Sequence, residues 1–165
     1  MQPFIQRLSM ACGETVNVSV LDGHEVVYVA RSNSPRLVSI GFHAGARAPA
    51  HVVSPGTVIL STYGDKALQR WVGEHEFTVF TPEGLSAPER FLEGVLAART
   101  LGYGVTEQQL DLGLRGLAVP LKDRKGDCKG AVGMTLQTQG MTREQTVTRL
   151  LPLLQETAQA LRPLL

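Results

Sequence analysis

The chain has 165 residues, of which 43% are apolar and 19% are charged, and its formal net charge is +1. This length suits one domain with a sizeable core, and the composition is typical of a globular chain rather than a disordered one. No apolar run reaches the roughly eighteen residues of a membrane span, and the N-terminus lacks the apolar core of a signal peptide. Acidic and basic residues are interspersed, without the basic stripe of a nucleic-acid-binding domain. We therefore expect a cytoplasmic domain that contacts neither a membrane nor, by itself, DNA.

The N-terminal part of the chain predicts a helix followed by a β-hairpin. Residues 3–12 place apolar side chains at helical spacing on one face. Residues 15–21 and 25–30 are rich in β-branched side chains, and the Asp-Gly pair between them is a strong signal for a tight turn. Residues 37–40 predict a further short strand.

Three helices are predicted for the middle of the chain, after a Gly- and Ala-rich loop at 41–49. Ser54 is expected to be the N-cap of the first, with a proline at the first helical position. A second short helix covers about 65–72. The third is expected to begin at Ser86, the first residue of a capping box, and to end at Gly102.

The C-terminal third predicts three strands and a long helix. Strands are expected near 103–106 and 114–121, and a third at 130–136 follows a charged turn. A capping box headed by Thr142 opens the last helix, in which Pro152 predicts a kink or a break. Consecutive strands joined by tight turns indicate a mainly antiparallel sheet with helices packed on it. The whole chain is therefore predicted to be one α+β domain.

No motif of a known catalytic or cofactor site occurs in the sequence: there is no P-loop, no nucleophile elbow, no His-Glu-x-x-His and no Cys-x-x-Cys. Two cysteines, Cys12 and Cys128, stand in apolar contexts that indicate buried, reduced thiols. Of the four histidines, His43 and His51 flank the Gly-rich loop and could converge, whereas the other two are expected at the surface. Their spacing is not that of a metal site, so neither a metal nor a cofactor is expected.

Several hydroxyl side chains and glycines are candidates for a small-molecule site, because such sites are apolar cavities with a few polar groups. For the hydroxyl groups the alternative is a local role, and Ser54 in particular is fully explained by helix capping. For Gly116 and Gly133, which lie within predicted strands, the alternatives are a β-bulge or space left for a ligand. The hydroxyl candidates are Ser54, Thr57, Thr106 and Thr135.

Four segments together resemble the effector-binding domain of IclR-family transcriptional regulators, in order and over nearly the whole chain. They are the hairpin residues 14–17 and 27–30, the Gly-x-Arg-x-Pro segment in 45–51 with Ser54-Pro55-Gly56, the stretch Gly-Leu-Arg-Gly-Leu-Ala-Val-Pro-Leu at 113–121 after Gly102-Tyr103, and the strand 130–136. The segment around Pro49 also resembles members that control aromatic-acid and β-ketoadipate catabolism.

The resemblance implies a GAF-like fold, in which a sheet carries helices on both sides and a ligand cavity on one face. It implies a homo-oligomer, either a dimer or a tetramer. It also implies that DNA is contacted only through an N-terminal winged helix-turn-helix domain, which these 165 residues do not contain. No catalytic residue is implied.

The resemblance further assigns residues to the wall of the ligand cavity. The sequence departs from the family at some of them: family members often carry an acidic residue where Thr106 stands, and serines where Gly133 and Thr135 stand. Pro55 replaces a methionine and removes one backbone N–H. The assigned residues are Leu37, Ile40, Ser54, Pro55, Thr106, Leu114, Gly116, Gly133 and Thr135.

The ligand expected from these positions is a small organic acid of aromatic type. Its carboxylate is expected at the helix start, where Ser54 and the free N–H groups of Gly56 and Thr57 favour an anion. Arg47 is either a further charge partner or a structural residue of its loop. Two alternatives to a ligand sensor are kept: a GAF-like enzyme such as a thiol-dependent reductase, which requires a cysteine in the cavity, and an oligomerisation module without a ligand.

Overall fold

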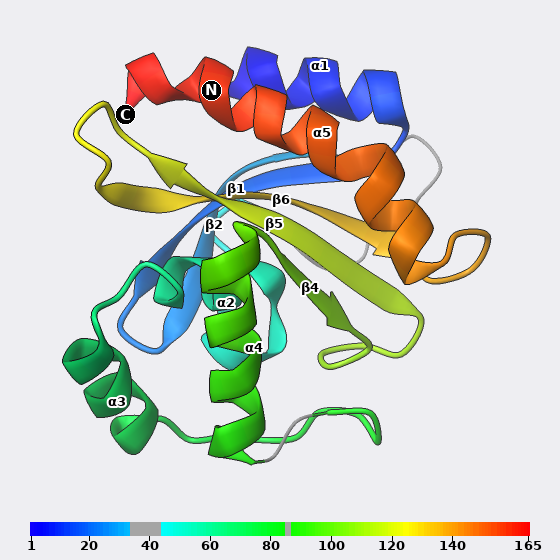
Figure 1. Ribbon diagram of the computed structural model, residues 1–165. Helices are drawn as coiled ribbons and strands as arrows, with labels where there is room; N and C mark the ends of the chain where they lie inside the picture. The colour runs from blue at the N-terminus through cyan, green and yellow to red at the C-terminus, as the bar shows by residue number, and fades with distance from the viewer. Residues whose placement is uncertain (34–43, 85–86) are drawn as a thin grey trace.

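The computed structural model describes residues 1–33, 44–84 and 87–165. Within them, six strands form one antiparallel sheet in the order β3-β2-β1-β6-β5-β4. Helices cover both faces of the sheet (Figure 1). The fold is therefore the α+β architecture that the sequence predicts.

The elements follow the predicted order. The strands are β1 (Thr15–Asp22), β2 (Glu25–Ser32), β3 (Arg47–Pro49), β4 (Gly104–Glu107), β5 (Leu114–Lys122) and β6 (Cys128–Gln137). The helices are α1 (Gln2–Cys12), α2 (Ser54–Leu60), α3 (Asp65–Glu74), α4 (Pro88–Leu101) and α5 (Arg143–Leu161), with 3-10 turns η1 (Ala50–Val52) and η2 (Arg162–Leu164). The strand predicted at 37–40 lies outside the described residues.

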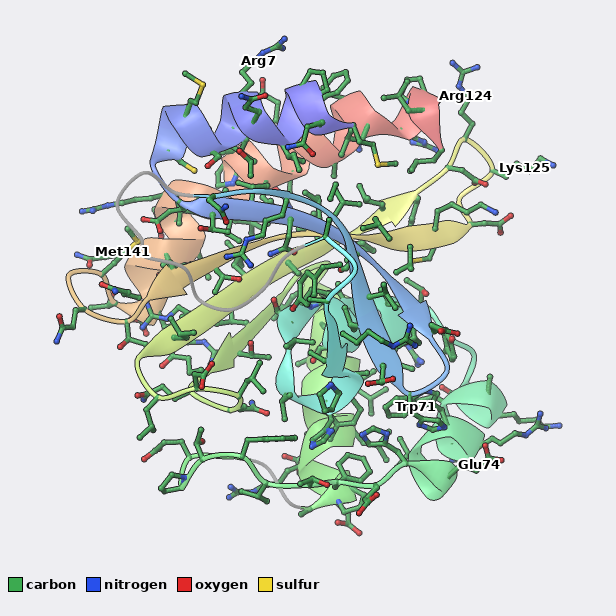
Figure 2. All side chains as sticks on the ribbon, turned by 180° about the vertical axis from the view of Figure 1, so that it is seen from behind. Arg7, Trp71, Glu74, Arg124, Lys125 and Met141 are labelled. Carbon is green, nitrogen blue, oxygen red and sulfur yellow. The ribbon has the colours of Figure 1, made fainter. Side chains whose placement is uncertain are left out.

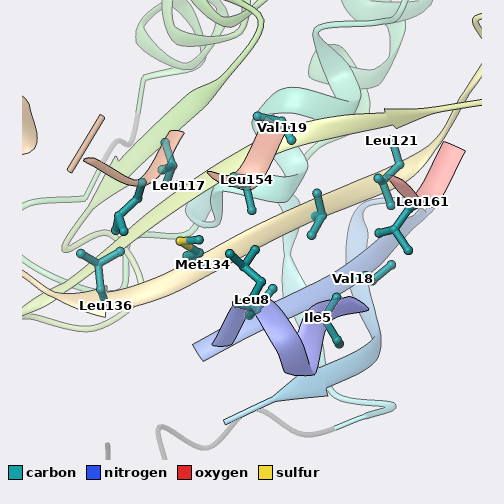
Figure 3. Close-up of a cluster of buried hydrophobic side chains, with 13 residues drawn as sticks. Ile5, Leu8, Val18, Leu117, Val119, Leu121, Met134, Leu136, Leu154 and Leu161 are labelled. Atoms are coloured by element: carbon teal, nitrogen blue, oxygen red, sulfur yellow. The ribbon is translucent and has the colours of Figure 1, made fainter. Parts of the chain in front are cut away.

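The helices α1 and α5 lie side by side across one face of the sheet (Figure 1). Together with β1, β5 and β6 they enclose the main hydrophobic cluster (Figure 3), in which Ile5, Leu154 and Leu161 have no exposed surface. A helix of eleven residues is too short to be stable alone in water. Contacts with α5 of the same chain supply the stabilisation that α1 needs.

Two of the three predicted helix caps, those of α4 and α5, have different outcomes. Thr142 heads the predicted capping box, because its hydroxyl accepts a hydrogen bond from the Gln145 N–H at 3.1 Å and the Gln145 side chain accepts one from the Thr142 N–H at 3.0 Å. The N-cap of α4 is Ala87, so the prediction of Ser86 was wrong by one residue. The predicted break at Pro152 does not occur, since α5 continues to Leu161; Pro152 is exposed, where water can replace the missing backbone donor.

On the other face of the sheet, α2 packs against β5 and β6, and α4 packs against α2 (Figure 1). Every residue of α2 is buried. The short helix α3 lies farther out, beside the turn between β1 and β2, and its Trp71 points at that turn (Figure 2). This face holds the cavity that we consider next.

Candidate functional site

A cavity, here called the central cavity, lies between the sheet and the first turn of α2. It encloses ≈ 420 Å³ of empty space, part of which is open to solvent. Val52 and Val53 supply an apolar wall, and residues 108–111, which follow β4, form its rim. The chain thus has a concave site where the predicted residues were expected to meet.

Most of the predicted site residues do converge on the central cavity. Gly56, Thr57 and Gly133 do not line it, and Leu37 and Ile40 lie outside the described residues. Those that line it are Ser54, Pro55, Thr106, Leu114, Gly116 and Thr135.

The hydroxyl groups of Ser54 and Thr106 meet over Gly116. A β-carbon at position 116 would lie 2.7 Å from Ser54 Oγ and 2.8 Å from Thr106 Oγ1. Thr106, Gly116 and Thr135 are also cross-strand neighbours in one row of the sheet. Position 116 therefore has no room for a side chain, because the two hydroxyl groups occupy the space above the glycine.

Ser54 is not a helix cap, contrary to prediction. The N-cap of α2 is Val53, in extended conformation, and Ser54 and Pro55 are the first two helical residues. Pro55 still lies in the first turn, where a backbone N–H has no partner within the helix. Because the Ser54 hydroxyl makes no capping hydrogen bond, it is available to the cavity.

The contacts at the helix start argue against the anion site that was expected from Gly56 and Thr57. The Thr57 N–H already donates to the Val53 carbonyl at 3.4 Å. The α-carbon of Gly56 faces the Ala50 backbone, and Thr57 lines a separate hollow beside α4 and β4. The helix α2 also has only seven residues, which limits its dipole. The hydroxyl pair over Gly116 is thus the better-placed polar group for a ligand.

Gly133 lies next to the cavity rather than in its wall. A β-carbon there would be 3.0 Å from the Leu117 carbonyl oxygen, 3.3 Å from the Ala118 β-carbon and 3.5 Å from Asn17 Oδ1. The glycine therefore fits close packing between neighbouring strands. It is not a bulge, because its pairing with Asn17 and Ala118 is regular.

Three amide side chains that the sequence analysis missed also line the cavity: Asn17, Gln108 and Gln109. Asn17 lies on β1, is only 4% exposed, and its Oδ1 has no hydrogen-bond partner among the described residues. Gln108 adopts a left-handed backbone conformation with φ 55°, and its carbonyl accepts a hydrogen bond from the Thr81 hydroxyl. The signal that was available for Asn17 was an amide in the middle of the alternating strand that runs from 15 to 21.

The cations near the site are already paired. Arg47 donates to Asp22 at 2.6 Å and to Glu25 at 3.0 Å, so the structural interpretation of this residue is the one that the contacts support. Arg115, the cation among the described lining residues, donates to Glu107 at 2.6 Å. A ligand carboxylate in this cavity would therefore meet mainly neutral donors.

Three histidines, at the turn between β1 and β2, in η1 and at the end of α3, form a hydrogen-bonded chain, contrary to the prediction that His24 and His75 are surface residues. His24 Nδ1 lies 2.9 Å from His75 Nδ1, and His75 Nε2 lies 2.7 Å from His51 Nδ1. His51 Nε2 is 2.7 Å from the Thr78 carbonyl oxygen. The rings of His24 and His75 both stack on Trp71, with centroids 4.6 and 4.2 Å away. His43, the other predicted partner of His51, lies outside the described residues.

The Thr78 carbonyl fixes the protons along this chain. A carbonyl only accepts, so His51 carries its proton on Nε2 and accepts at Nδ1. His75 must then donate from Nε2 and, when neutral, accept at Nδ1 from His24. Protonating His75 would place an N–H at its Nδ1 opposite the Nδ1–H of His24, where both would be donors. Only a change of the His24 tautomer would remove that conflict. Burial, and to a lesser degree the charges of His51 and His24, lower the pKa of His75 from 6.5 to about 4.

We expect stability to fall as the pH is lowered through this histidine chain. The pKa of His75 is lowered to about 4 in the folded chain, and burial also lowers that of His51, so the unfolded chain binds more protons between about pH 6.5 and pH 4. Melting temperatures measured from pH 7.5 to 4.5 should therefore decrease, and less steeply in His75→Asn. If melting temperature fell equally steeply with pH in the unaltered chain and in His75→Asn, the lowered pKa of His75 would be contradicted.

No group of three or more His, Cys, Asp or Glu side chains in the described part of the chain is placed to hold a metal ion. The histidine rings face each other at hydrogen-bond distance instead. Cys12 and Cys128 are half-buried rather than buried, and neither is among the described residues of the cavity wall. The reductase alternative therefore lacks the cavity cysteine that it requires.

Residues 1–162 match the family described as "Bacterial transcriptional regulator IclR C-terminal". The chain belongs to the IclR C-terminal family. The Pca regulon regulatory protein of Pseudomonas putida is 32% identical over 93% of this chain and 53% of its own length. The p-hydroxybenzoate hydroxylase transcriptional activator of Acinetobacter baylyi is 34% identical over 99% of this chain and 62% of its own length. This IclR C-terminal chain thus spans only about half to three-fifths of those relatives.

A solved structure agrees with this assignment. The inducer-binding domain of the PobR transcription factor from Acinetobacter, a double mutant in complex with 3-hydroxybenzoic acid, has a TM-score of 0.92 and 33% identity, and the alignment covers 99% of this chain and 96% of that one. The predicted family, the predicted fold and the resemblance to aromatic-acid regulators are confirmed. These relatives are transcriptional regulators, which also confirms the prediction that the IclR C-terminal chain is not an enzyme. No helix in the described residues is long and apolar enough to cross a membrane.

Proposed function

We propose that the chain is the effector-sensing part of a transcriptional regulator and that its central cavity binds an aromatic carboxylic acid. The observation that carries this proposal is the pair of hydroxyl groups, from Ser54 and Thr106, that converge over Gly116 in the cavity wall. The cavity around them is bounded by apolar side chains such as Val52 and Leu114. A relative of the same fold is known in complex with an aromatic acid, which supports the ligand class.

In this proposal the ligand carboxylate accepts hydrogen bonds from Ser54 and Thr106, and the ring lies between the start of α2 and the sheet. Neutral donors suffice for an anion when several converge in a site of low polarity. Thr135, in the same row as Gly116, offers a third hydroxyl group.

The regulatory step would be a change of population between two arrangements of the whole protein. A ligand shifts such an equilibrium only by its difference in affinity for the two states, and the coupling with DNA is reciprocal. DNA contact would be made by a part of the regulator beyond residues 1–165, in the cytoplasm. A homo-oligomer, dimer or tetramer, rests on the family resemblance alone, because the apolar face of α1 is covered by α5 of the same chain.

Thermal shift with matched ligands tests the proposal. An acid at about a hundred times its dissociation constant should stabilise the chain by roughly 2.7 kcal/mol, which is a melting shift of roughly 5–10 °C. Benzoate and hydroxybenzoates should give this shift, and benzamide should not. Equal shifts from the acids and the amide would contradict a carboxylate site.

The variant Gly116→Ala places a methyl group on the point where the hydroxyl groups converge, and should weaken binding of the acids by roughly tenfold or more. Gly133→Ala is the matched control, because this glycine lies on the same face of the sheet but outside the cavity wall. The control should lower the melting temperature, since its β-carbon meets backbone, and should keep the affinity for benzoate. Unchanged affinity in Gly116→Ala would place the carboxylate elsewhere.

A further inference from the structure

The central cavity has a second polar end at Asn17. Three buried side-chain atoms have no hydrogen-bond partner among the described residues: Asn17 Oδ1, Ser19 Oγ and Gln109 Oε1. Asn17 and Gln109 line the cavity, whereas Ser19 does not. Asn17 is only 4% exposed and lies on a strand in the middle of the sheet, while Gln109 belongs to the rim. A buried amide without a partner is destabilising, so its presence in the cavity wall requires an explanation.

The position of Asn17 relative to the hydroxyl pair determines how long a ligand must be to contact both. Asn17 pairs with Gly133 on β6, and Gly133 lies two residues along from Thr135, which pairs with Gly116 on β5. Two strand spacings and two residues of rise give roughly 12 Å between the α-carbons of Asn17 and Gly116. The Asn17 oxygen leans toward β6, because it would be 3.5 Å from a β-carbon at Gly133. The polar atoms lie closer together than the α-carbons, because the Asn17 side chain reaches toward β6, so a small ring with a polar substituent at each end can contact both.

We infer that Asn17 hydrogen-bonds a ring hydroxyl group of the effector and so makes the site prefer hydroxylated over unsubstituted aromatic acids. This inference rests on the proposed function and adds its second polar contact. A phenolic hydroxyl both donates and accepts, so it satisfies either face of the Asn17 amide. A carboxylate only accepts, so it could pair with the Asn17 NH2 group but would leave Oδ1 without a partner. The two ends of the cavity thus select different groups: the hydroxyl pair over Gly116 takes the acid and Asn17 takes the hydroxyl.

The test compares benzoate, 3-hydroxybenzoate and 4-hydroxybenzoate by calorimetry on three proteins. The unaltered chain should bind at least one hydroxybenzoate roughly tenfold more tightly than benzoate. In Asn17→Leu this preference should fall below about threefold, while the affinity for benzoate changes little. Ser19→Ala is the matched control: it removes another buried, unpartnered oxygen two residues away on β1, outside the cavity wall, and should keep the preference.

A second measurement separates ligand contact from a structural role. Without ligand, Asn17→Leu should melt at or above the temperature of the unaltered chain, because an unpaired buried amide is replaced by an apolar group of similar size. If the leucine variant does not fold, Asn17→Ala removes the amide without adding bulk. Equal binding of benzoate and both hydroxybenzoates, or a preference that survives the loss of the amide, would overturn the inference and leave the proposed function standing. Failure of all three acids to bind the unaltered chain would overturn both.

Discussion

Replacing Trp71 with alanine is expected to lower the free energy of unfolding by about 3–5 kcal/mol. Trp71 is 7% exposed, and its indole N–H donates to the Gly23 carbonyl at 2.8 Å. Its ring stacks on His24 and His75, so it connects α3 to the hairpin turn between β1 and β2. The truncation would remove that hydrogen bond, leave a cavity, and free both histidines to move into water.

Urea denaturation measures the effect, and two variants bracket it. Trp71→Phe keeps a stacking ring but loses the N–H donor, so its loss should lie well below that of the alanine variant. Gln69→Ala changes an exposed position on the same helix and should stay within about 0.5 kcal/mol of the unaltered chain. A loss for Trp71→Ala below about 1 kcal/mol would mean that α3 contributes little to the fold. The histidine chain would then not depend on this stack.

Much of the fold was predictable because its signals are local. The Asp-Gly turn, the glycine that ends α4 and the capping box at Thr142 each fix backbone geometry within a few residues. The register of antiparallel strands follows once their turns are placed, because successive side chains alternate between the two faces. The caps at Ser54 and Ser86 were misplaced by one residue, since a cap depends on where the preceding backbone turns, and that is set by packing as well as by sequence.

The site was harder to predict because its partners are distant in sequence. The stack of His24 and His75 on Trp71 joins a turn to the end of a helix, and nothing in the spacing of these residues announces it. Asn17 was read only as a polar position in a strand, because its missing partner becomes visible only when neighbouring strands are in place. Gly116 and Thr106 were candidates both from their residue type and from the family resemblance, and the structure then supplied the geometry that joins them to Ser54.

Gly56 was predicted to be a ligand-site residue, but its contacts indicate a packing role. The sequence placed it in the ligand site because its N–H was expected to face an anion. In the structure, a β-carbon at this position would lie 1.9 Å from the Ala50 carbonyl oxygen and 2.7 Å from the Ala50 carbonyl carbon. Both atoms belong to backbone, so no side-chain rotation can relieve the clash. The glycine therefore allows α2 to approach η1, and through that approach it holds Val53 and Ser54 in the cavity wall.

The variant Gly56→Ala should consequently lose about 3 kcal/mol of unfolding free energy or more, although alanine favours helix formation by about 1 kcal/mol. Gly73→Ala in α3 is the matched control, because no atom lies within 4 Å of its added β-carbon and the change should be neutral or slightly stabilising. Urea denaturation of both variants, followed by calorimetry with a hydroxybenzoate, separates the two roles of Gly56. A packing role predicts a large loss of stability in Gly56→Ala. A direct ligand role predicts a normally stable protein with weakened binding, and that result would restore the helix start as the anion site.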